Sequence, residues 1–237
     1  MSEQSYLRDV HSQSGLGKKR RLYLKLFDQM PDVFGQSILD VGAGMPVFLE
    51  KTKFAKKTAL DIDDYYREQF DALGIAFVKA DLDREELSDI GPFDTAICSD
   101  VFEHLTQPLK ALQSIKAVMT PGGVLLSHVP NEYRLKKTIS IMLSRSEGMY
   151  YHTNMNEWDD PHFRRFTDRG FKRFLAQEFA HNLRLNPLSP SSQEKLLNGL
   201  GITAPLALTA GPTYFSTDDA SKAAALKAFA GKRQCFM

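Results

Sequence analysis

The sequence predicts an α/β protein with a doubly wound, mostly parallel sheet that is covered by helices on both faces. Short apolar runs that favour β-strands alternate with stretches of helical periodicity through the first half of the chain. The glycine turn Gly42–Gly44 joins the first of these runs, Ile38–Val41, directly to a helical stretch. Such alternation is typical of parallel strands that are linked by helical crossovers.

Acidic side chains mark the ends of the first three predicted strands. Asp40 lies at the end of the first strand, and Asp61 follows it by 21 residues at the end of the second. Asp81 directly follows the third strand. Asp40 would repel a pyrophosphate, so this strand end suits a cationic ligand instead. The later strands are predicted at Thr58–Asp63, Ile75–Ala80, Phe93–Ser99 and, after the turn Pro121–Gly123, Val124–Val129.

The whole chain, 1–237, is predicted to form a single domain. Residues 1–19 are expected to be an arm or lid, 131–163 an insertion that covers substrate, and 234–237 a final edge strand. The main helices are predicted at 20–30, 111–119, 168–179 and 219–230. Thr167 is a suitable N-cap for the helix 168–179, and Gly231 is expected to end the helix 219–230.

The composition argues against two classes of partner. The 237 residues include 30 Lys and Arg against 29 Asp and Glu, which favours neither a nucleic-acid coat nor a membrane-surface protein. No apolar run approaches membrane-spanning length and the first residues are polar, so a cytoplasmic protein is expected. Cys98 and Cys235 are expected to be buried thiols. The sequence carries no signal for the oligomeric state.

Five motifs resemble, in order and spacing, those of the class I S-adenosylmethionine-dependent methyltransferases. The resemblance implies a Rossmann-like, seven-stranded sheet and S-adenosylmethionine as cofactor. The segment His162–Thr167 resembles the small-molecule branch of that superfamily. One departure is that the third glycine of the first motif is missing, and Met45 and Pro46 stand there. The five motifs are Asp40–Gly44, Asp61, Asp81–Leu82, Glu103–Leu105 and Pro121–Gly123.

The resemblance implies which residues contact the methionine and ribose parts of the cofactor. The backbone of Gly42, Ala43 and Gly44 would lie along the methionine moiety, with Asp40 near its ammonium group, directly or through water. Asp61 would accept hydrogen bonds from both ribose hydroxyls. Asp63 and Asp64 are the alternatives for that role, although Asp61 ends the apolar run more directly.

The resemblance also implies contacts to the adenine and to the reacting end of the cofactor. Asp81 would accept a hydrogen bond from the adenine amino group, and the Leu82 N–H would meet a ring nitrogen. Ile62 and Val101 would pack on the adenosine. The residues expected to border the sulfonium and the substrate are Ser99 and Asp100.

The function that follows is methyl transfer to a small-molecule acceptor, at oxygen before nitrogen. His128 and His162 are the first candidates for a general base, and a structural or orienting role is left open for each. His104 is expected to pack behind the site. Three aromatic residues could wall the substrate or form a small core of the insertion: Tyr133, Tyr151 and Trp158.

Two alternatives are kept. The first is an RNA methyltransferase, whose RNA the basic runs at 18–21 and 164–173 could bind. These runs could equally be solvated helix faces, from which one or two arginines, such as Arg164 and Arg165, reach an anionic substrate. A non-catalytic, S-adenosylmethionine-binding regulatory protein is the other alternative. No metal site is predicted because the His and Cys residues lack ligand spacing, apart from a weak opening at Asp159–Asp160.

Overall fold

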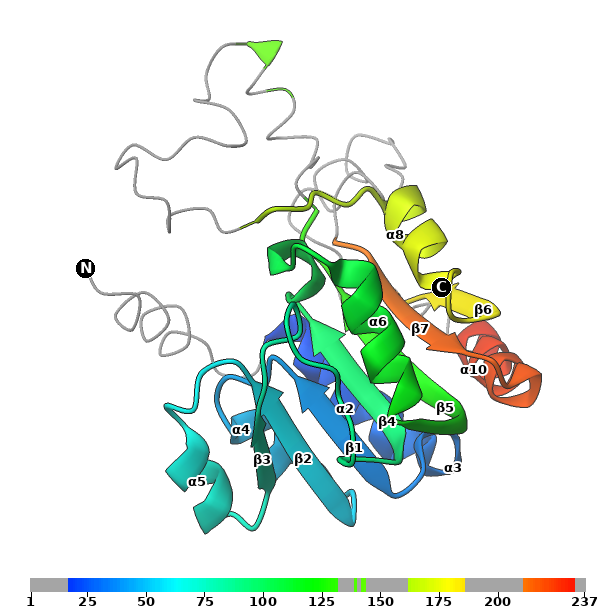
Figure 1. The fold of residues 1–237 in the computed structure, drawn as a ribbon. Coiled ribbons are helices and arrows are strands. Elements are labelled where there is room, and N and C mark those ends of the chain that lie inside the picture. Colours follow the sequence, from blue (N-terminus) through cyan, green and yellow to red (C-terminus); the bar gives the residue numbers. More distant parts are fainter. Residues whose placement is uncertain (1–16, 132–138, 140–141, 144–161, 186–210, 233–237) are drawn as a thin grey trace.

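A seven-stranded sheet forms the centre of the protein in a computed structural model that describes residues 17–131, 139, 142–143, 162–185 and 211–232. The strand order is β3-β2-β1-β4-β5-β7-β6 (Figure 1). Strands β1 to β5 are parallel, whereas β7 is antiparallel to both β5 and β6. The fold class predicted from the sequence is therefore confirmed. The strands are β1 Ser37–Val41, β2 Lys56–Asp61, β3 Ala76–Lys79, β4 Phe93–Ser99, β5 Met119–His128, β6 His181–Arg184 and β7 Thr213–Thr217.

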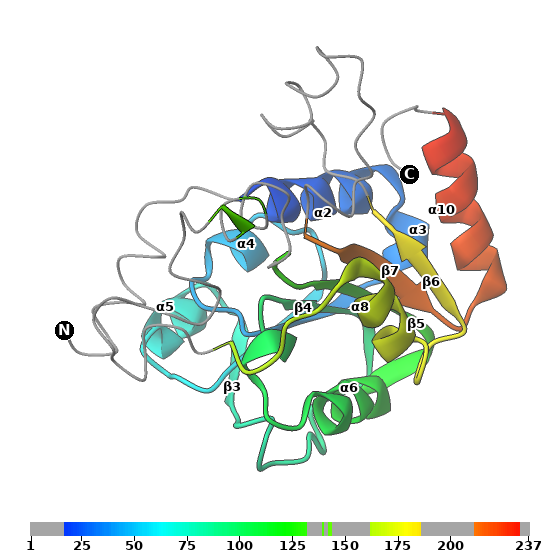
Figure 2. The same ribbon diagram turned by 90° about the horizontal axis from the view of Figure 1, so that it is seen from above.

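Helices cover both faces of the sheet. Figure 2 shows α2, α3 and α10 on one face, and α6 and α8 on the opposite face. None of the described helices is long and apolar enough to cross a membrane. The helices are α2 Lys18–Gln29, α3 Pro31–Phe34, α4 Val47–Glu50, α5 Arg67–Ala72, the 3₁₀ helix η1 Phe102–His104, α6 Pro108–Ala117, α8 Asp168–Leu175 and α10 Ala220–Lys232.

Two apolar cores lie on the two faces of the sheet, and alternate residues of each strand contribute to them. Ile38 of β1 packs in the core that contains Leu26 of α2. The next residue, Leu39, packs in the core that contains Leu112 of α6. Because side chains alternate along a strand, Asp40 lies on the same face as Ile38 and therefore beneath α2.

The edge of the sheet differs from the sequence prediction. The strand expected at 234–237 lies outside the described residues, and β7 and β6 complete the sheet instead. All five residues of β7, Thr-Tyr-Phe-Ser-Thr, are buried, but its two aromatic side chains are adjacent and its other three residues carry hydroxyl groups, so the sequence shows no apolar alternation. Periodicity could not identify this strand.

Several boundaries also differ. The predicted helix 111–119 is α6 and ends at Ala117, the predicted helix 168–179 is α8 and ends at Leu175, and α10 continues through Gly231. The expectation that Thr167 caps α8 is confirmed, since its Oγ1 accepts a hydrogen bond from the Gly170 N–H.

The glycine pair expected to form a turn before β5 lies inside that strand. Gly122 has φ +73°, and a Cβ on Gly123 would lie 2.9 Å from the Thr120 carbonyl oxygen. The register of β5 against β4 shifts at the same place, between Phe93 and Thr95. Glycine is therefore required where β5 bends to join β4.

Only small parts of the predicted arm and insertion are described. Lys18 and Lys19, expected in the arm, belong to α2. Residues 1–16 of the arm lie outside the described part, as do most of the insertion and its three aromatic residues, Tyr133, Tyr151 and Trp158.

Candidate functional site

The glycine turn after β1 packs against β2 and against the residues that follow β4. Gly42 has φ +66°, and a Cβ there would lie 2.4 Å from Val101 Cγ2. The N–H groups of Gly42 and Ala43 both donate to the Leu60 carbonyl oxygen of β2, at 2.8 and 3.2 Å. Both the positive φ and the contact with Val101 exclude a larger residue at position 42.

Asp61, at the end of β2, is held in a fixed orientation by two backbone groups. Its Oδ2 accepts from the Gly44 N–H at 2.9 Å, and its Oδ1 accepts from the Asp63 N–H at 3.2 Å. A carboxylate has about four lone-pair positions, so each oxygen can still accept a bond from a ligand. The Asp63 carboxylate instead accepts from the Tyr65 N–H in the following turn.

Asp40 is a buried acid at the end of β1, with 1% of its surface exposed. Its Oδ2 accepts a hydrogen bond from Arg20 Nη1 of α2 at 2.5 Å, and that guanidinium lies over the ring of Phe48. Its Oδ1 has no hydrogen-bond partner among the described residues. Burial raises the pKa of Asp40, and the Arg20 charge opposes this rise in part.

Two further residues of α2 contact the end of β4. The hydroxyl of Tyr23 lies 3.3 Å from the Oγ of Ser99, and burial raises the pKa of Tyr23. Lys19 forms an ion pair with Asp100, whose φ is +57° and whose N–H donates to the His128 carbonyl oxygen. Burial alone would raise the pKa of Asp100, but the ion pair with Lys19 outweighs it, and that pKa is lowered.

His128, at the end of β5, is buried and oriented from two sides. Its Nδ1 lies 2.8 Å from the Oγ1 of Thr213, and its Nε2 lies 3.6 Å from the Oδ1 of Asp100. A Cβ on Gly211 would lie 2.5 Å from the ring, so this side of the imidazole is tightly packed. In the tautomer that donates from Nδ1 to Thr213, Nε2 carries the lone pair that a general base needs.

Two residues of the basic run at the start of α2 are not part of a solvated helix face, whereas Arg21 is exposed. Lys19 and Arg20 pair with acids at the ends of β4 and β1. Tyr23, one helical turn later, reaches Ser99. The sequence signal for this role is weak, because pairs across 81 and 20 residues of chain leave no local pattern.

The arginines expected to clamp an anionic substrate already donate to backbone carbonyl groups. Arg164 Nη2 donates to the Thr106 carbonyl oxygen, and Arg165 Nη1 donates to that of His162, each at 2.7 Å. These bonds fix the segment that follows the insertion. A clamp by these two residues stays a prediction.

The remaining predicted cofactor contacts lie around the ends of β2 and β3. Ile62, which directly follows β2, is 62% exposed, so its side chain is accessible to a ligand. Asp81 accepts from the Asp83 N–H and lies 3.4 Å from Arg84. The Leu82 side chain is buried in the core.

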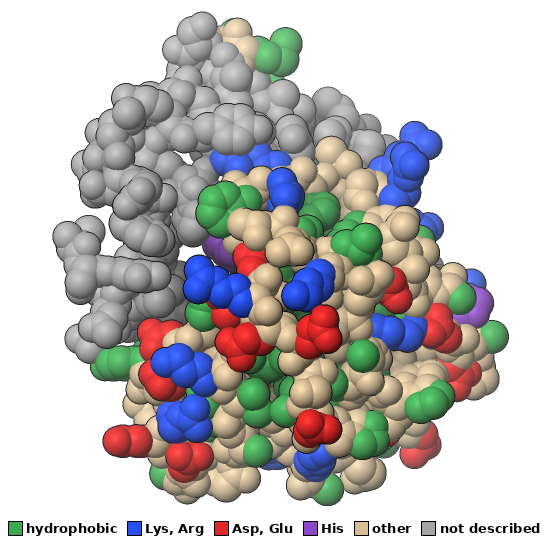
Figure 3. Space-filling view, in the orientation of Figure 1, with side chains coloured by type: hydrophobic (Ala, Val, Ile, Leu, Met, Phe, Trp, Pro, Cys, Tyr) green, Lys and Arg blue, Asp and Glu red, His purple; other side chains and the backbone are tan. Residues whose placement is uncertain are grey.

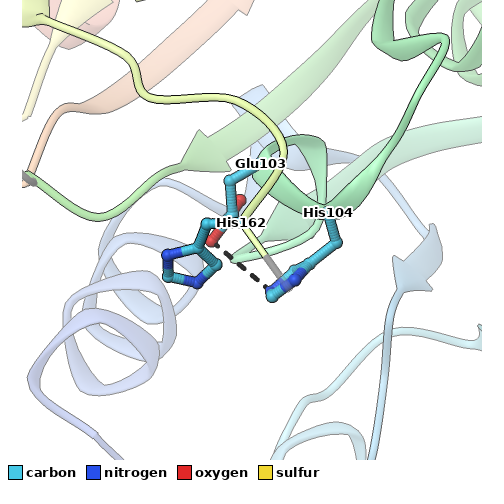
Figure 4. A group of neighbouring side chains, drawn as sticks. All are labelled: Glu103, His104 and His162. Carbon is cyan, nitrogen blue, oxygen red and sulfur yellow. Dashed lines mark ion pairs between the residues drawn. The ribbon is translucent and has the colours of Figure 1, made fainter. Parts of the chain in front are cut away.

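Glu103, His104 and His162 form a group that the sequence analysis did not predict (Figure 4). Each offers one ligand atom, and these atoms all lie within 4.8 Å of one another. Glu103 and His104 belong to η1, and His162 comes from the segment before α8. Their separation along the chain explains why residue spacing gave no sign of a metal site. His104 thus lies beside His162, with ring centroids 4.7 Å apart.

Comparisons with known proteins identify the family and the fold of this chain. The family described as "Methyltransferase domain" matches residues 11–184. A methyltransferase from Clostridium acetobutylicum, described as S-adenosylmethionine-dependent, has a similar fold, with a TM-score of 0.62 at 14% identity over 90% of this chain and 96% of that one. NodS, an N-methyltransferase from Bradyrhizobium japonicum solved with S-adenosyl-L-homocysteine, gives 0.52 at 13% identity over 90% and 96%.

Two curated relatives match a shorter region. Both are ubiquinone biosynthesis O-methyltransferases, one from Actinobacillus pleuropneumoniae (28% identical over 105 residues) and one from Vibrio parahaemolyticus (26% over 106). The match covers 39% and 41% of this chain, and 45% of each relative.

The chain therefore belongs to the methyltransferase domain family, and its fold is that of the class I S-adenosylmethionine-dependent enzymes. The family expected from the sequence is therefore confirmed.

The ion pair of Arg20 and Asp40 generates a prediction about stability. The change Arg20→Met should lower the free energy of unfolding by about 3–5 kcal/mol at pH 8, because it leaves a buried carboxylate without its cation. Burial already raises the pKa of Asp40, and loss of Arg20 should raise it further. As the pH falls through that raised pKa the carboxyl is protonated, so the loss should be smaller at pH 5.

Urea unfolding of both proteins at the two pH values measures this difference. Arg21→Met, one residue further along α2 at an exposed position, is the matched control and should change little. The double variant Arg20→Met, Asp40→Asn should recover part of the loss. Equal effects of the Arg20 and Arg21 changes would contradict the account.

Proposed function

We propose that the ends of β1, β2 and β4 hold S-adenosylmethionine and that the protein transfers its methyl group to an oxygen of a small-molecule acceptor. The observation that carries the cofactor site is the pair of carboxylates on either side of the glycine turn. Asp40 presents a buried oxygen without a hydrogen-bond partner among the described residues, and Asp61 is oriented by two backbone N–H groups.

The two acids suit different parts of the cofactor. Asp40 Oδ1 would take the ammonium group of the methionine moiety, whose charge would offset the cost of burying the carboxylate. Asp61 would take the two ribose hydroxyls. The turn Gly42–Gly44, including Ala43, would lie along the methionine chain, and the lack of a Cβ at position 42 lets this turn pack directly against Val101.

The rest of the cofactor would extend over β2, β3 and β4. Ile62, which is exposed, and Val101 would pack on the adenosine. Asp81 would accept from the adenine amino group, and the Leu82 N–H would donate to a ring nitrogen. Ser99 and Asp100, at the end of β4, would border the sulfonium.

Methyl transfer is an in-line displacement at carbon. The acceptor oxygen forms the new bond, the carbon–sulfur bond breaks with its electron pair on sulfur, and S-adenosylhomocysteine leaves as a neutral thioether. The enzyme's main contribution is to align the two reactants and to exclude water. A hydroxyl acceptor must also lose its proton.

His128 is the proposed base for that proton. Its Nδ1 partner Thr213 fixes the ring, and the Asp100 carboxylate 3.6 Å from Nε2 would stabilise the imidazolium that forms. His162, the other candidate from the sequence, lies in the separate group with Glu103 and His104.

The choice of a small-molecule oxygen acceptor is supported by the curated relatives, which are O-methyltransferases named for ubiquinone biosynthesis. An RNA acceptor has less support. Figure 3 shows acidic and basic side chains interspersed over the lower part of one face, and the formal net charge of the chain is +1. Polynucleotide binding is typically carried by a continuous basic surface.

The proposed cofactor site is tested by calorimetric titration with S-adenosylhomocysteine. Asp61→Ala should lower the affinity at least about tenfold, because about 1.4 kcal/mol of charge-assisted hydrogen bonding to the ribose is lost. Asp64→Ala, an exposed acid in the next turn that pairs with Lys79, is the matched control and should bind normally. A folded wild type that binds no cofactor would contradict the proposal. Asp63→Ala tests the alternative ribose acid.

The proposed base is tested once a screen of hydroxylated metabolites gives a methyl acceptor. His128→Asn should lower kcat by about 10²–10⁴-fold while cofactor affinity stays unchanged, because only proton removal is impaired. His181→Asn, on β6, is the control histidine. Wild-type turnover in the His128 variant would assign that residue a structural role instead.

A further inference from the structure

The group formed by Glu103, His104 and His162 has the composition of a metal site. A carboxylate oxygen and two imidazole nitrogens lie within 4.8 Å of one another. His104 Nε2 lies 3.9 Å from Glu103 Oε1, and the two imidazole rings meet edge to face (Figure 4). Ligands of one metal at about 2.0–2.2 Å from it lie about 3–3.5 Å apart. Side-chain rotations that move each ligand atom by about 1 Å would therefore bring these atoms to coordination distance.

The backbone holds the three residues together before any ion binds. Glu103 and His104 are consecutive in η1, and the His104 N–H donates to the Val101 carbonyl oxygen at 2.9 Å. The Arg164 N–H donates to the Glu103 carbonyl oxygen at 3.0 Å, which joins the segment of His162 to η1. The site thus does not depend on two surface side chains meeting by chance.

The burial of Glu103 is compatible with a metal ligand. Glu103 is 1% exposed, and buried carboxylates are typically paired with positive groups or coordinate metals. His104 and His162 are half-buried, so neither imidazole is fully enclosed. Three protein ligands with an open side are typical of sites at which a metal also binds water or a substrate.

We propose that Glu103, His104 and His162 bind a divalent first-row transition-metal ion, such as Zn²⁺, Mn²⁺ or Fe²⁺. Two imidazoles favour these ions over Mg²⁺ and Ca²⁺, which prefer oxygen ligands. His162 is then a metal ligand and not a general base.

The location suggests a use for the ion. The 3₁₀ helix η1 begins two residues after Asp100, at the end of β4 that would border the sulfonium. The open side of the metal would bind the acceptor oxygen and lower the pKa of its hydroxyl, so that the acceptor would lose its proton more readily. This use of the metal rests on the proposed function, whereas the metal site itself does not.

Titration of the metal-free full chain with Co²⁺ tests the site, because coordinated Co²⁺ acquires visible ligand-field absorption. The wild type should bind one ion per chain. Glu103→Gln, His104→Asn and His162→Asn should each weaken binding at least about tenfold, since loss of a supporting group alone costs about 10–100-fold. His181→Asn removes a histidine outside the group and should bind as the wild type does.

Titration with S-adenosylhomocysteine separates a lost metal site from a misfolded variant and from a wrong function. The His162→Asn protein should keep its cofactor affinity. Failure of the wild type to take up Co²⁺, Zn²⁺ or Mn²⁺, or equal affinity in the His162 and His181 variants, would overturn the metal site. Metal uptake without any methyl transfer would leave the site standing and contradict only the proposed function.

Discussion

The buried carboxylate of Asp40 is the constraint around which the functional end of the sheet is arranged. An ionised acid that is 1% exposed is stable only beside a cation, and Arg20 supplies that charge from α2. The pair therefore fixes where α2 crosses the carboxyl ends of the strands. It satisfies one oxygen of Asp40 and leaves the other without a partner among the described residues.

The same helix organises the neighbouring strand ends. Because strand side chains alternate between faces, Asp40, Ser99 and His128 all lie on the face that α2 covers. Tyr23 contacts Ser99, and Lys19 pairs with Asp100, which lies next to His128. An acid, a hydroxyl and an imidazole thus follow one another across β1, β4 and β5. The opposite side of the β4 end, through η1, carries Glu103 and its two histidines.

The sequence predicts the parts of this arrangement that local pattern determines. The parallel strands, the glycine turn and the acids at the strand ends are readable because apolar runs, special φ values and the period of a βα unit leave local signals. Strand β7 is not, since its fully buried Thr and Ser residues lack alternation. The pairing of Arg20 with Asp40 and the meeting of Glu103 with His162 depend on tertiary packing, for which residue spacing gives no information.

The structure of the protein bound to S-adenosylhomocysteine tests the central claim most directly. The account predicts the amino group of the ligand within hydrogen-bond distance of Asp40 and the ribose hydroxyls on Asp61, with α2 still paired to Asp40 through Arg20. A ligand bound away from the ends of β1 and β2, or one that displaces Arg20 and leaves Asp40 without any cation, would contradict it.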